Sequence, residues 1–183
     1  ASSVGHYVAQ MARLKGAHVI GTVGSPEKAA LVQNVGVTDL IDYKKDDVAA
    51  RVKALTSGRG VDFIVDMDFS TTTKLVSEAA IAEHGMVVCF GSNVAGPIPI
   101  DFGAWLQRSI SIRFFLVYQL LPADRARAVE GLTRLLEDRK LEITDLPEPE
   151  APGPGEVTLR VKAVALNHID VWGWRGMAFA KRK

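Results

Sequence analysis

The chain is predicted to be an α/β protein built on a doubly wound parallel sheet. Short apolar runs, typical of buried strands, alternate with longer stretches in which apolar residues recur at helical spacing. Helical connections between successive strands make the strands parallel, and a parallel sheet is covered by helices on both faces. Hydrophobic residues make up 48% of the 183 residues, which is enough to form a core.

The elements follow one another from the N-terminus to about residue 144. Val4, Val8 and Met11 lie on one helical face, and Gly16 follows as a stop. Ser25 and Pro26 have the N-cap and first-turn positions of the next helix. The predicted helices cover 4–12, 25–36, 46–57, 71–83 and 122–140, and the predicted strands cover 18–22, 39–43, 61–66, 86–90 and 109–117.

The amino-acid composition changes after Ile143. The segment 145–157 contains four prolines and two glycines, which is typical of a stiff linker. The segment 156–165 then alternates polar and apolar residues, which is typical of a strand with one solvent-exposed face. We therefore divide the chain into a nucleotide-binding domain at 1–144, a linker at 145–155 and a fragment at 156–183 that is too short for its own core.

Composition excludes several classes of protein. Lys and Arg number 22 against 21 Asp and Glu, so the net charge of +1 gives no field for nucleic acid or anionic lipid. No apolar run approaches the ~20 residues of a membrane span, and the N-terminus has no signal-peptide pattern. A single cysteine, Cys89, excludes an internal disulfide and a cysteine-rich zinc site. We predict a cytoplasmic protein without metal, nucleic-acid partner or membrane contact.

Small residues open the chain where a strand-to-helix turn would bind a diphosphate. The first N–H groups of a helix lack partners and its dipole favours an anion, while small side chains permit close approach. Ser2, Ser3, Val4 and Gly5 supply these properties, although only the last glycine of the G-x-G-x-x-G pattern is present. Taken alone, the pattern fits an ordinary helix cap, and the repeated βα units that follow favour phosphate binding.

The end of the strand at 18–22 indicates which dinucleotide binds. Sheets that bind NAD usually carry an acid there, which accepts bonds from the ribose hydroxyls. Here no acid lies between Val19 and Ser25, and Lys28 follows one helical turn later. A hydroxyl and an ammonium hold a 2′-phosphate, so Ser25, Lys28 and Tyr43 predict NADPH as the cofactor. The alternative for Lys28 is an ordinary solvated lysine, and the missing acid also disfavours a methyltransferase-type sheet.

Two further strand ends carry candidate residues. Phe90, Gly91 and Ser92 follow one strand with small and polar groups, as strands do beneath a ligand. Phe115 lies in the strand at 109–117, where the backbone could meet a nicotinamide amide, although aromatic residues in a strand are more often core. Asp66 and Asp68 lack a histidine at ligand spacing, so we expect them to cap a loop and not to bind metal.

These motifs together resemble the NADPH-binding half of medium-chain dehydrogenase/reductases, in the zinc-independent quinone oxidoreductase (zeta-crystallin-like) branch. The similar segments are "SSVGHYVAQMARLKGAHVIGTVGSPEKAALV", "GVDFIVD" and "GMVVCFGS". The stretch "LPEPEAPGPGEVTLRVKAVALNHIDVWGWRG" resembles the start of the family's GroES-like catalytic domain. In the family that stretch comes first, so the resemblance implies a Rossmann-type domain that lacks its first strand, in a rearranged and truncated enzyme.

The resemblance also implies roles for individual residues. Ser2 to Gly5 match the diphosphate turn, and Ser25, Lys28 and Tyr43 match the contacts to the 2′-phosphate. Phe90, Gly91, Ser92 and Phe115 match the nicotinamide end, and Asn167 and Asp170 match a polar pair that lines the active site. For that pair a polar turn after a strand remains an equal alternative, and Trp172 stands where several relatives have tyrosine.

The implied function is hydride transfer from NADPH to a quinone or another conjugated carbonyl, without zinc. The strand at 109–117 matches the edge through which relatives pair as homodimers. Whether this chain itself turns over a substrate stays open, and the alternative function is a non-catalytic nucleotide-binding remnant.

Overall fold

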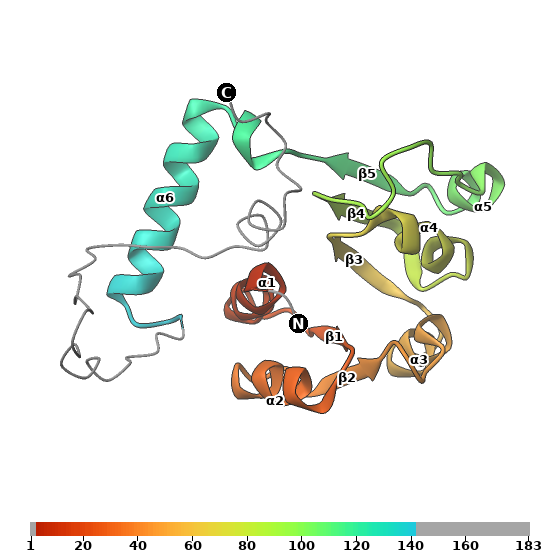
Figure 1. Cartoon of the computed structure of the whole chain (residues 1–183), viewed down its shortest axis with the longest axis horizontal. Helices are drawn as coiled ribbons and strands as arrows, with labels where there is room; N and C mark the ends of the chain where they lie inside the picture. The colour runs from red at the N-terminus through yellow and green to blue at the C-terminus, as the bar shows by residue number, and fades with distance from the viewer. Residues whose placement is uncertain (1–2, 142–183) are drawn as a thin grey trace, which may run out of the picture. The chain divides into compact units, whose positions relative to one another are not determined.

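Strands and helices alternate along residues 3–141, which the computed structural model describes and which lie within one unit of the chain (Figure 1). The helices are α1 (Ser3–Leu14), α2 (Pro26–Asn34), α3 (Val48–Leu55), α4 (Phe69–Ser77), α5 (Phe102–Gln107), the 3-10 helix η1 (Val117–Gln119) and α6 (Pro122–Glu137). The strands are β1 (Ile20–Val23), β2 (Asp39–Asp42), β3 (Val61–Asp66), β4 (Ile81–Cys89) and β5 (Ser111–Phe114).

Every strand pairing in this part of the chain is parallel, which confirms the predicted α/β class. The strands form two groups, a two-stranded sheet in the order β1-β2 and a three-stranded sheet in the order β3-β4-β5. Ile20 lies opposite Asp39 in the first sheet, and Asp66 lies opposite Cys89 in the second. All the carboxyl ends within one parallel sheet therefore meet at one edge, which is where such sheets bind ligands.

Helices cover opposite faces of the first sheet. Val23 of β1 packs with Ala9 of α1, whereas Ile20 packs against the cluster that contains Ala49 and Val52 of α3. Alternate residues of a strand point to opposite faces, so α1 and α3 lie on opposite sides. Val61 of β3 packs against the same α3 cluster, which therefore joins the two sheets in one core.

The second sheet is covered on one face by α4 and α5. Val87 and Cys89 of β4 are buried with Phe69 of α4 and Trp105 of α5, and the rings of Phe69 and Trp105 meet edge to face at 6.1 Å. On β3, Ile64 points into this cluster. Its neighbours Phe63 and Val65 point the other way and are 65% and 48% exposed.

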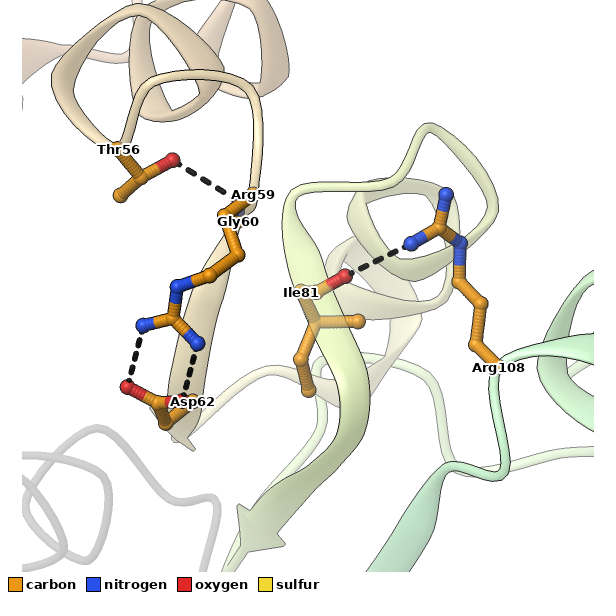
Figure 2. A network of polar contacts seen from close by, with 6 residues as sticks. All are labelled: Thr56, Arg59, Gly60, Asp62, Ile81 and Arg108. Carbon is orange, nitrogen blue, oxygen red and sulfur yellow. Dashed lines mark hydrogen bonds and ion pairs between the residues drawn. The ribbon is translucent and has the colours of Figure 1, made fainter.

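The turn into β3 depends on Gly60 (Figure 2). Its φ is +86°, and a Cβ there would lie 2.7 Å from the carbonyl carbon of Ile81, so only glycine fits without a backbone shift. The Gly60 N–H donates to Thr56 Oγ1 over 2.9 Å. Nearby, the Arg59 guanidinium binds both oxygens of Asp62 at 2.6 and 2.8 Å, and Arg108 Nη1 donates to the Ile81 carbonyl at 3.3 Å.

Two predicted elements differ from the structure, and one helix was not predicted. The helix expected at 71–83 ends at Ser77, and residues 81–83 belong to β4, because Ile81 pairs with Val61 of β3. The strand expected at 109–117 is confined to Ser111–Phe114 and is followed by η1. Helix α5 was not predicted, although Asp101 caps it by accepting from the Ala104 N–H.

Candidate functional site

The candidate site comprises the predicted residues at the first turn of α1 and at the strand ends. Val4 and Gly5 are exposed in the first turn of α1, which contains no acidic residue that would repel a phosphate. Ser3 is the first residue of α1. Ser2, Asn167 and Asp170, together with the linker 145–155 and the fragment 156–183, lie outside the described residues.

The ends of β1 and β2 meet at Gly24 and Tyr43. The Val23 carbonyl accepts from the Tyr43 N–H at 3.1 Å, and a Cβ on Gly24 would lie 2.5 Å from Tyr43 Oη. The Tyr43 ring therefore packs on Gly24, while the side chain is 53% exposed. No acidic side chain lies between Val19 and Ser25, so β1 is followed by the Ser25 hydroxyl, whereas β2 ends at Asp42, beside the Tyr43 phenol.

Ser25 and Lys28 are adjacent at the start of α2. Ser25 is the N-cap of this helix, and its Oγ accepts from the Lys28 N–H at 3.4 Å. The hydroxyl also bonds to the Glu27 carboxylate and so lowers the pKa of Glu27. Lys28 is exposed, so its ammonium can reach a ligand in solvent. Ser25 thus has a structural role in addition to the predicted one.

Four predicted residues line one cleft of about 430 Å³ at the carboxyl ends of β4 and β5: Phe90, Gly91, Ser92 and Phe115. The Phe90 and Phe115 rings lie 5.8 Å apart. A Cβ on Gly91 would lie 2.7 Å from the Met67 carbonyl oxygen, so only glycine fits this close to the Met67 backbone. Such an open, partly aromatic cleft suits a flat heteroaromatic ring.

Asp68 fixes the loop that borders this cleft. Its carboxylate accepts from the Asn93 N–H at 3.0 Å, from Asn93 Nδ2 at 2.7 Å and from Ser70 Oγ at 2.5 Å. Partial burial acts to raise the pKa of Asp68, but the hydrogen bonds from Asn93 and Ser70 together outweigh it, so the pKa lies below its usual value.

The loop-capping role predicted for Asp68 is confirmed, and Asp66 shares it by accepting from the Asp68 N–H at 2.8 Å. The link from Asp68 to Asn93 was not predicted. Polar residues that follow two neighbouring strands, "DMD" and "GSN", were its signal in the sequence.

Cys89 is inert in this arrangement. Its side chain is 3% exposed, and burial raises the pKa of its thiol. The Sγ donates to the Gly91 carbonyl over 3.2 Å. Cys89 therefore packs as a small apolar residue beneath the cleft.

A family model described as "Zinc-binding dehydrogenase" matches residues 3–135, more than half of the chain. The chain belongs to this family. Several of its relatives are quinone oxidoreductases, the branch of the medium-chain dehydrogenase/reductase superfamily that the sequence motifs resemble.

Individual relatives agree with this placement. The chain is 39% identical to a quinone oxidoreductase of Pseudomonas aeruginosa over 109 residues. This stretch covers 59% of this chain and 33% of that protein. A Pseudomonas syringae quinone oxidoreductase structure is 31% identical with a TM-score of 0.68, and covers 79% of this chain and 45% of its own. The mycobacterial protein Rv1454c complexed with NADPH is 26% identical, with a TM-score of 0.69 over 79% of this chain and 46% of its own. The chain thus matches less than half the length of each.

Within residues 3–141 no helix is long and apolar enough to cross a membrane, and no three His, Cys, Asp or Glu side chains gather as metal ligands would. The family description mentions zinc, whereas the sequence predicts a protein without it. Zinc independence and a cytoplasmic location both remain predictions.

Proposed function

We propose that residues 3–141 form the NADPH-binding domain of an oxidoreductase that transfers hydride to a quinone or another conjugated carbonyl. The observation that carries the proposal is the cleft formed by Phe90, Gly91, Ser92 and Phe115, at the edge where parallel sheets bind dinucleotides. The NADPH complex of the mycobacterial relative supports the choice of cofactor.

The residues present fit a dinucleotide phosphate. The cleft that Phe90, Gly91, Ser92 and Phe115 line leaves room for a flat ring. At the other end of the site, Ser25, Lys28 and Tyr43 would hold a 2′-phosphate, with no acid between Val19 and Ser25. The Ser25 hydroxyl, which bonds to the Glu27 carboxylate in the free chain, would turn to the phosphate instead. In the first turn of α1, the N–H groups around Val4 and Gly5 would bind the diphosphate.

The bound cofactor supplies the hydride from its nicotinamide ring. The chain's own groups orient that ring and exclude water from one side of it, which is how positioning lowers a reaction barrier. Asn167 and Asp170 are the proposed polar residues beside the substrate. Among the described strands β5 lies at one end of its sheet, with Phe114 of β5 61% exposed and Val117 beyond it 52% exposed. This edge supports a homodimer that pairs through β5.

Calorimetry with NADPH and NADH tests the cofactor. A charge-assisted bond to phosphate contributes roughly 1.5–3 kcal/mol. Because Lys28 is exposed, we expect Lys28→Ala to weaken NADPH binding about tenfold and to leave NADH nearly unchanged, with a smaller difference at high salt. Lys15→Ala, which removes an exposed lysine directly after α1, is the matched control.

Equal losses for both cofactors in Lys28→Ala would show that Lys28 supports the fold and not the phosphate. Tighter binding of NADH than of NADPH by the unaltered chain would overturn the cofactor assignment. A quinone-reduction assay on the same sample separates an oxidoreductase from a domain that binds NADPH without turnover.

A further inference from the structure

A second cleft, of about 400 Å³, lies where the last turns of α1 and α2 meet the residues that follow α6. Helix α2 ends at Asn34, shortly before β2 begins at Asp39, so this cleft lies at the amino end of the first sheet. The proposed cofactor contacts lie at the opposite, carboxyl end. Along α1 alone, the rise from Gly5 to Arg13 is roughly 12 Å, so the two sites are separate.

The charged residues that line this cleft are all basic. They are Arg13 from the end of α1 and Arg139 and Lys140 from the segment after α6. Leu141, which also lines the cleft, is only 4% exposed, so the segment that carries Arg139 and Lys140 is anchored by a buried side chain. Three cations around one space repel one another unless an anion shares that space with them.

The Arg13 guanidinium is fixed in the wall of the cleft. Its Nη1 donates to the Val35 carbonyl and so ties the end of α1 to the end of α2. Gly36 has a φ of +79°, and a Cβ there would lie 2.2 Å from Nη1, so the guanidinium packs directly on this glycine. An arginine has five N–H donors, and the bond to Val35 uses only one of them.

The two cations after α6 are not needed to cap that helix. Basic side chains near a helix C-terminus often bond its last carbonyls. Here the main-chain N–H groups of Arg139 and Lys140 already donate to carbonyls in the last turn of α6. The Lys140 ammonium pairs with Asp138 at 2.8 Å, whereas within residues 3–141 the Arg139 guanidinium has no hydrogen-bond or ion-pair partner.

We propose that this cleft binds a small oxyanion with at least two negative charges, of the phosphate ester or dicarboxylate class. A guanidinium donates paired hydrogen bonds to the oxygens of either group, and Arg13 and Arg139 provide two such donors. Lys140 adds a third charge, and Asn34 adds an amide donor. A cleft of about 400 Å³ falls within the usual range for small-molecule sites.

Amide chemical shifts of the full chain, followed by NMR during titration with pyrophosphate or with succinate, test the proposal. Sodium chloride at the same ionic strength is the reference, because any salt screens exposed charges. We expect saturable shifts centred on Asn34, Gly36 and Leu141. Tighter binding of pyrophosphate would indicate a phosphate ester as the ligand, and tighter binding of succinate a dicarboxylate.

Arg139→Gln is the diagnostic variant, because within the described part of the chain this side chain holds nothing else in place. We expect the dissociation constant of the anion to rise at least about tenfold, as the loss of a charge-assisted hydrogen bond implies, and the Tm without anion to stay unchanged. Arg139→Lys keeps the charge without the planar fork and should bind with intermediate affinity. Arg51→Gln, which removes an exposed arginine of α3, is the matched control and should bind as the unaltered chain does.

Four results would overturn the proposal. Shifts that rise without saturation, and equally with sodium chloride, would mean general screening. Saturable shifts confined to Val4, Gly5 and Ser25 would place the anion in the proposed cofactor site alone. Unchanged affinity in Arg139→Gln would exclude this cleft. Shifts of Asn34 and Gly36 caused by Asp145→Asn without any anion would mean that the chain's own carboxylates take the ligand's place. The titrations contain no NADPH, so their outcome is independent of the proposed function.

Discussion

Replacing Asp68 by Asn tests how the loop bordering the cleft is held. The carboxylate accepts three hydrogen bonds, two from Asn93 and one from Ser70. An amide in its place retains one oxygen and turns an NH₂ donor toward Asn93 Nδ2, which is itself a donor. One bond is therefore lost, and the remaining two lose their charge-assisted strength.

The magnitude follows from these contacts. Hydrogen bonds to a charged group contribute roughly 1.5–3 kcal/mol each and neutral ones roughly 0.5–1.5 kcal/mol. The two Asn93 bonds are exposed to solvent, which reduces their contribution. We expect Asp68→Asn to lower the unfolding free energy by about 1–2 kcal/mol and the Tm by about 3–6 °C. Thermal unfolding followed by circular dichroism measures both.

The pH dependence distinguishes this cause from a general loss of packing. The folded pKa of Asp68 lies below its unfolded value, so its contribution is complete above the unfolded value and is lost as the pH falls through the folded one. The difference between the unaltered chain and Asp68→Asn should be constant from pH 5 to pH 8 and shrink below about pH 4. Asp62→Asn, which breaks an exposed pair with Arg59, should have the smaller effect at pH 7. An equal Tm loss at pH 3 and pH 7 in Asp68→Asn would refute the reasoning.

Three further predictions concern the fold, the metal and the assembly. Gly60→Ala should lower the unfolding free energy by at least about 2 kcal/mol, because the cost of a positive φ adds to that of a clash with the Ile81 backbone. Gly58→Ala, at φ +85° but in open space, should cost only about 1 kcal/mol. Equal Tm losses in the two variants would argue against the clash. Elemental analysis after chelator-free purification should find far less than one zinc per chain, since the sequence has one cysteine and no clustered histidines, whereas zinc requires three or four nitrogen or sulfur ligands. About one zinc per chain would contradict this. Light scattering should give twice the chain mass if β5 pairs two copies, and folded monomer would count against it.

Local signals predicted the elements that they control. Ser25 and Pro26 fixed the start of α2, and the structure has Ser25 as its N-cap and Pro26 as its first residue. The small and polar residues after β4 likewise identified Phe90, Gly91 and Ser92, which line one cleft. In each case a few neighbouring residues determine the geometry, so one sequence is sufficient.

The predictions fail where contacts with distant segments determine the local structure. Residues 81–83 continue a helical pattern in the sequence, but Ile81 pairs with Val61 and the His84 N–H donates to the Arg108 carbonyl at 2.8 Å. These contacts place 81–83 in β4 and overcome local propensity, which is worth only a few tenths of a kcal/mol per residue. The bond from Asp68 to Asn93 spans 25 positions and was missed for the same reason.

Phe63 and Val65 show a third kind of disagreement, between apolar pattern and burial. "VDFIVD" reads as a buried strand, and the strand is present at Val61–Asp66. Its Ile64 is packed against α4 and α5, while Phe63 and Val65, on the other side, are largely exposed. A sequence records which side chains favour burial, but burial also needs an opposing surface. The exposures of Phe63 and Val65 therefore show that an apolar pattern predicts a strand without showing which of its faces is buried.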